Sequence, residues 1–80
     1  MDLNELKEKV EALLPEADVA DIKSVQQLHA YLNGYATASR YNIEDEKTFN
    51  KLLKGEQLSK EESKWVRASC AFQIVQAALN

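Results

Sequence analysis

The side chains best suited to nucleophilic or metal chemistry are one cysteine, Cys70, and one histidine, His29. Sequence spacing does not exclude a Cys–His pair, because such pairs meet in space. Cys70, however, lies among apolar neighbours, where burial keeps a thiol protonated and inert. A zinc site needs about four ligands in register, and the two glycines stand apart rather than in a phosphate-binding loop. We therefore expect a buried Cys70, no catalytic residues, no metal and no cofactor.

Basic side chains form the second candidate group, although the 80 residues carry a net charge of −3. Residues 1–46 have a net charge of −6 and residues 47–80 one of +3. The six bases of the second part form two triplets with i, i+4, i+7 spacing, so each triplet lines one helical face: Lys47, Lys51, Lys54 and Lys60, Lys64, Arg67. On adjacent helices they would form one basic patch able to attract phosphates or an acidic protein. The alternative is that both faces are simply solvated, as charge runs usually are.

Residues 30–60 resemble a helix-turn-helix DNA-binding domain with a short second helix. The resemblance rests on Ala38, Asn42-Ile43 and the run from Phe49 to Gly55. Thr48 and Lys51 depart from the pattern, which has apolar packing residues there. Such a domain presents the N-terminal residues of its second helix to base edges, and here these are acidic: Glu44, Asp45 and Glu46. Because carboxylates repel phosphates, nucleic-acid binding is the alternative function rather than the preferred one.

Helices must position all these side chains, since glycine and proline are scarce and alanine and leucine abundant. Four helix starts are marked by a capping residue and a carboxylate or amide three positions later: Asp2/Glu5, Ser24/Gln27, Asn42/Asp45 and Ser59/Glu62. Pro15 and Gly55 mark helix ends. The sequence predicts one all-α domain, residues 1–80, folded as a compact bundle of four helices at about 3–13, 25–40, 43–54 and 60–79 with short connections.

Apolar stripes give each predicted helix an inner face. The stripes of the first three helices are Leu3/Leu6/Val10/Leu13, Val25/Leu28/Leu32/Tyr35 and Phe49/Leu52/Leu53. Beside the second stripe, Ala30, Gly34 and Ala38 form a ridge of small side chains. A glycine inside a helix costs about 1 kcal/mol of stability relative to alanine, so its presence calls for a packing reason. We expect that reason to be the close approach of another helix to this ridge.

The last predicted helix is apolar over most of its circumference. One stripe consists of Trp65, Ala68, Phe72, Val75 and Leu79, and a second of Val66, Cys70, Ile74 and Ala77. A helix of this kind is buried on more than one side. We expect it to be the central helix of the bundle or to be covered in part by a second chain.

These features favour a small, acidic, free-standing protein that binds another protein as a regulator, adaptor or inhibitor of a larger cytoplasmic machine. The candidate contact residues are Ala30, Tyr31, Gly34, Ala38 and Tyr41. A homodimer through the last helix or the small-residue ridge is a coupled hypothesis. No charge-free run approaches the ~20 apolar residues of a membrane span, so we expect no membrane contact. A phage or mobile-element origin is a prior expectation for so small a protein, not something its residues show.

Overall fold

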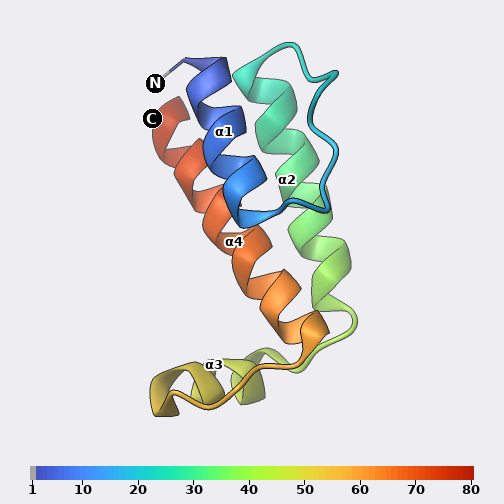
Figure 1. Ribbon diagram of the computed structural model, residues 1–80, viewed down its shortest axis with the longest axis vertical. Coiled ribbons are helices and arrows are strands. Elements are labelled where there is room, and N and C mark those ends of the chain that lie inside the picture. The colour runs from blue at the N-terminus through green and yellow to red at the C-terminus, as the bar shows by residue number, and fades with distance from the viewer. Residues whose placement is uncertain (1) are drawn as a thin grey trace.

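Four helices make up most of the protein, whose computed structural model describes residues 2–80. They are α1 (Leu3–Leu13), α2 (Val25–Arg40), α3 (Asp45–Lys54) and α4 (Lys60–Leu79). The all-α class and the compact bundle of four helices are thus confirmed, and residues 2–80 contain no strand. In Figure 1, α1, α2 and α4 run side by side, whereas α3 lies across the end of α2 and α4. Helix α4 packs against both α1 and α2.

The predicted capping residues set three of the four helix starts. The Asp2 carboxylate accepts a hydrogen bond from the Glu5 amide at 2.9 Å, and the Ser24 hydroxyl accepts one from the Gln27 amide at 3.1 Å. A full capping box opens α4 at Ser59. The fourth start is wrong: α3 begins at Asp45, and Glu44 rather than Asn42 occupies the N-cap, without a capping bond from its side chain.

Two features end the helices as the sequence predicts. Pro15 follows directly after Leu14, which caps the C-terminus of α1 and has left the helical conformation. Gly55 ends α3 in the left-handed conformation, with φ of 70°. Only glycine adopts that conformation without a steric penalty, so the turn from α3 towards α4 depends on this residue.

The core lies between α1, α2 and α4. Its buried side chains are Leu6, Val10 and Leu14, then Ala17 and Val19 of the first connection, then Leu28, Leu32, Ala68, Ala71 and Val75. The buried centre of α4 is therefore largely alanine. Because the distance between packed helices depends on the side chains at their contact, these alanines let α1 and α2 lie close to α4.

The expectation that α4 is buried on more than one side is only partly met. Trp65 and Phe72 are half-buried, and Cys70 and Ala77 are exposed. The prediction of a buried Cys70 is therefore wrong. The physical reason is that α1 and α2 cover one side of α4, while α3, the remaining helix, lies across the bundle's end. Of the second apolar stripe, Val66 and Ile74 are therefore half-buried, while Cys70 and Ala77 face outward.

The small-residue ridge is also not a packing surface within the chain. Ala30, Gly34 and Ala38 are all exposed. Apart from Gly34, its two neighbours in sequence and the adjacent backbone of its own helix, no atom of the described residues lies within 4 Å of the position that a Cβ on Gly34 would take. The expected close approach of another helix is therefore not made inside this subunit.

Among the described helices, none is both long and apolar enough to cross a membrane.

Candidate functional site

Helix α3 turns its large apolar side chains to solvent. Phe49, Leu52 and Leu53 are 58%, 45% and 72% exposed, whereas Thr48 is completely buried. The prediction that these three apolar residues form the inner face of the helix is therefore wrong. We call them the α3 surface.

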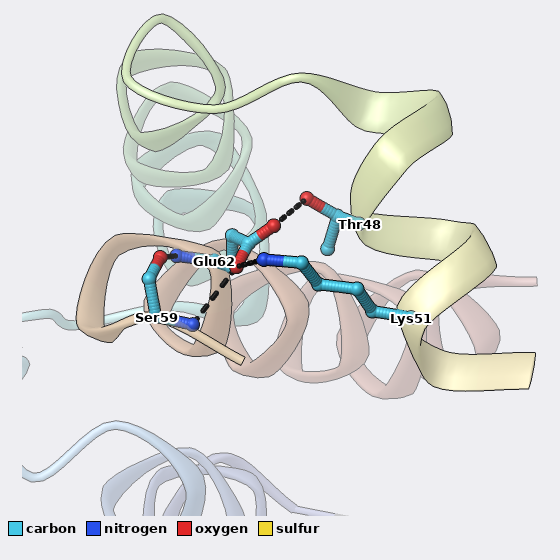
Figure 2. A network of polar contacts seen from close by, with 4 residues as sticks. All are labelled: Thr48, Lys51, Ser59 and Glu62. Carbon is cyan, nitrogen blue, oxygen red and sulfur yellow. Dashed lines mark hydrogen bonds and ion pairs between the residues drawn. The ribbon is translucent and has the colours of Figure 1, made fainter. Parts of the chain in front are cut away.

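A buried carboxylate on α4 explains this orientation. Glu62 Oε2 accepts a hydrogen bond from Thr48 Oγ1 at 3.0 Å, and Glu62 Oε1 accepts one from Lys51 Nζ at 2.8 Å, as Figure 2 shows. The Ser59 amide also donates to Glu62 Oε1, at 2.8 Å. Since Thr48 and Lys51 lie three residues apart, they share one helical face. Turning that face towards α4 turns the apolar face of α3 away from it.

The contacts of Glu62 also stabilise its charge. The ammonium of Lys51 and the amide of Ser59 lower the pKa of Glu62 from 4.5 to about 2. A carboxylate that accepts several hydrogen bonds remains ionised well below its ordinary range. This network is therefore a charged joint between α3 and α4 at neutral pH.

A shallow hollow adjoins the α3 surface where α2 ends. Its volume is about 420 Å³, and it is lined by Thr37, Arg40, Tyr41, Ile43 and Asp45. Tyr41 is 85% exposed. Because Asp45 precedes Phe49 by one helical turn, the hollow leads onto the α3 surface. Together they make a partly apolar area with a depression at one end.

Two acids in the first turn of α3, Asp45 and Glu46, border this area. Glu46 is exposed and Asp45 pairs with Arg40 at 2.5 Å, whereas Glu44 lines a hollow with Lys47 and Lys51. Lys47, Lys51 and Lys54 lie on the opposite side of the helix, because each is roughly 100° or more around the axis from Phe49 and Leu53 at about 100° per residue. The border of the α3 surface is thus acidic on balance.

Three of the six bases predicted as a patch contact other side chains. Lys51 pairs with Glu62, and Arg67 pairs with both carboxylate oxygens of Glu16 at 2.6 and 3.1 Å. Lys64 Nζ lies 5.2 Å from the centre of the Tyr35 ring. The other three bases, Lys47, Lys54 and Lys60, are exposed.

Lysines of α3 and α4 line two polar hollows. Lys47 and Lys51 line one of about 460 Å³, together with Glu44 and Glu62. Lys60 and Lys64 line another of about 500 Å³, together with Glu61. Each pair of cations therefore shares its hollow with at least one carboxylate. Nucleic-acid binding through these bases stays a prediction.

The residues predicted to contact a protein lie along α2. Ala30, Gly34 and Ala38 form an exposed line, and Tyr31 is half-buried with its ring 6.0 Å from that of Tyr35. Tyr41, at the end of α2, is the member of this set that borders the hollow beside α3. Their role in binding remains a prediction.

The residues considered for chemistry have structural surroundings. His29 stacks on Phe72 of α4, with ring centres 4.7 Å apart. Its Nε2 lies 3.4 Å from Gln76 Oε1. Cys70 is exposed on α4. Within residues 2–80, no three His, Cys, Asp or Glu side chains gather in a way that could hold a metal ion.

The α3 surface was missed by reasoning from sequence, although a signal for it existed. Thr48 and Lys51 occupy positions where an inward helix face would carry apolar residues, and this departure marked the inner face as polar. The sequence spacing alone does not predict that the Glu62 carboxylate accepts hydrogen bonds from both of these side chains.

Comparison of the chain with known protein families, with curated proteins and with solved structures gave no match.

Proposed function

We propose that this protein works by binding another protein through the α3 surface. The observation that carries the proposal is the outward orientation of Phe49, Leu52 and Leu53. Grouped exposed apolar residues of this kind usually mark contact sites. Their i, i+3, i+4 spacing is the one with which an amphipathic helix enters a groove on a partner. We extend the proposal to a regulator, adaptor or inhibitor acting in the cytoplasm, the role that the sequence analysis favours.

The size of the α3 surface fits the centre of an interface with a larger partner. With ~200 Å² for a fully exposed side chain, its three residues present roughly 350 Å² of apolar surface. A stable interface buries about 800 Å² on each partner. The three residues would then be the anchors, and neighbouring residues such as Tyr41 would complete the contact.

Capture from the native cell extract with three variants tests this proposal. Leu53→Glu places a charge in the α3 surface, Ala30→Glu places one on the ridge of α2, and Gln73→Glu places one on the exposed side of α4. All three positions are exposed, and each variant adds one negative charge, so they are matched. Circular dichroism first establishes that each variant folds.

The proposal expects a protein recovered with the parent chain, Ala30→Glu and Gln73→Glu but lost with Leu53→Glu. Loss with Ala30→Glu alone would move the site to the ridge and overturn the proposal. Equal recovery with all variants would also overturn it. Recovery of nucleic acid that is lost with Lys47→Glu and Lys54→Glu would support the alternative function instead.

A further inference from the structure

Resting on the proposed function, we propose that the α3 surface binds a cationic amphipathic segment of the partner, in which lysines or arginines flank large apolar side chains. The proposal is carried by the one-sided distribution of charge around α3. Its apolar face is bordered by carboxylates, while its three lysines lie on the other side of the helix.

The helical positions of the acids place them beside the apolar anchors. Asp45 lies one turn before Phe49, and Glu46 lies two turns before Leu53, so both acids share the outward side of α3. Glu44, at the N-cap position, lies apart from them and lines the hollow that also contains Lys47 and Lys51. A partner that covers Phe49 and Leu53 therefore meets carboxylates at the edge of the contact.

The hollow at the end of α2 supplies a place for an apolar side chain. Tyr41 and Ile43 line it, and the Arg40–Asp45 pair lies at its wall. Since Arg40 is already paired with Asp45, the exposed Glu46 leaves the border net negative. Complementary charge on the partner would steer it and fix its register.

A second copy of this chain is a poor occupant of the same surface. Two copies that face each other through their three anchors would bring like charges together, which costs free energy at a protein contact. Each copy also presents the same acidic border, with its lysines on the far side of α3. The occupant that remains is a segment that brings its own cations.

Two synthetic helical peptides of about 14 residues, one of leucine and lysine and the other with glutamate at each lysine position, test the inference. The protein is labelled with ¹⁵N and titrated with each. We expect the lysine peptide to bind about tenfold more tightly, with the largest amide shifts at Tyr41–Leu53. Absence of binding, equal affinities, or shifts centred elsewhere would overturn the inference.

Charge-matched variants separate local recognition from the overall charge of the protein. Glu44→Gln/Glu46→Gln removes the two carboxylate charges that flank Asp45 at the start of α3, and Glu8→Gln/Glu11→Gln makes the same change in net charge on the exposed side of α1. We expect the first pair to weaken the lysine peptide about threefold or more and the second to leave its affinity within error. An equal effect of both pairs would overturn the inference.

The same variants separate this inference from the proposed function in the capture experiment. If the native partner is lost with Leu53→Glu and also with Glu44→Gln/Glu46→Gln, the cationic segment is supported. If it is lost with Leu53→Glu but held equally well by Glu44→Gln/Glu46→Gln, the proposed function stands and the inference falls. If Leu53→Glu has no effect, the proposed function itself falls.

Discussion

Thr48, the buried residue of α3, donates its hydroxyl hydrogen bond to the Glu62 carboxylate of α4 over 3.0 Å. Lys51 and the backbone of Ser59 complete the shell around the same carboxylate. No buried side-chain nitrogen or oxygen in residues 2–80 lacks a hydrogen-bond partner. Polar contacts therefore attach α3 to the bundle, and its apolar residues remain available at the surface.

Neutralising Glu62 should loosen α3 while leaving the rest of the bundle intact. In Glu62→Gln the amide keeps the shape of the side chain but loses the charge that Lys51 pairs with. We expect amide hydrogen exchange in Asp45–Lys54 to become about tenfold faster or more, because the local opening of α3 becomes easier. Exchange in α1 and α2 should change little, since the core lies elsewhere.

The neighbouring residue gives the matched control for this prediction. Glu61→Gln makes the same chemical change at an exposed position in the same turn of α4. Exchange in α3 should then match that of the parent protein. Equal acceleration in both variants would mean that loss of negative charge near the N-terminus of α4, rather than the joint with α3, controls the motion.

Acid should release α3 only at very low pH. The folded pKa of Glu62, about 2, lies below its ordinary value of 4.5. The stabilising contribution of Glu62 is therefore fully present above about pH 4.5 and is lost as the pH falls towards 2. Amide and side-chain NMR shifts of Thr48 and Lys51 followed from pH 6 to 2 should move only near the lower end. A midpoint near 4.5 would contradict the ionised joint.

The helix boundaries could be predicted because they depend on local chemistry. Asp2, Ser24 and Ser59 hydrogen-bond to amides three residues away, and Gly55 needs only its own backbone freedom. Asn42 is not the N-cap of α3, because the chain forms a turn at Asn42 and the helix begins only at Asp45. Such signals specify where helices begin, but not how they rotate about their axes.

The rotation of α3 could not be predicted because it depends on a contact between separate helices. Its apolar stripe favours an inward Phe49, Leu52 and Leu53, and only the position of Glu62 in space reverses that preference. Cys70 shows the same problem. Its apolar neighbours in sequence indicated burial, but the buried centre of α4 is Ala68, Ala71 and Val75, and Cys70 falls outside it.

Truncating a core leucine should lower the stability far more than truncating a leucine of the α3 surface. Leu32→Ala removes a fully buried side chain and should lower the free energy of unfolding by about 2–5 kcal/mol. Leu53→Ala removes an exposed one and should change it by about 0.5 kcal/mol or less. Chemical denaturation followed by circular dichroism measures both. A large loss in Leu53→Ala would place that side chain in a core contact instead.

The thiol of Cys70 should react in the folded protein. Its exposure on α4 means that a maleimide or a disulfide reagent reaches it without unfolding. We expect stoichiometric labelling of the native protein at neutral pH within minutes, measured by mass spectrometry, with unchanged circular dichroism afterwards. Cys70→Ser removes the chain's one cysteine and is the blank. Labelling that requires denaturant would restore the buried position expected from sequence.

Arg67 should stabilise the bundle through its geometry as well as its charge. Its guanidinium donates to both carboxylate oxygens of Glu16 and to the backbone oxygen of Leu13 at 2.9 Å, and so fastens the end of α1 to α4. Arg67→Lys keeps the charge but not the planar fork, and since Glu16 is partly exposed we expect a loss of about 0.5–1 kcal/mol. Hydrogen bonding to Arg67 lowers the pKa of Glu16, so the difference in stability between Arg67→Lys and the parent protein should shrink as the pH falls through that lowered pKa. Thermal denaturation measures this difference.

Arg40→Lys is the control, because it alters the more exposed ion pair with Asp45, and it should lower the stability by less in the same measurement. If the two substitutions cost the same, the contact with Leu13 adds nothing beyond an ordinary surface ion pair.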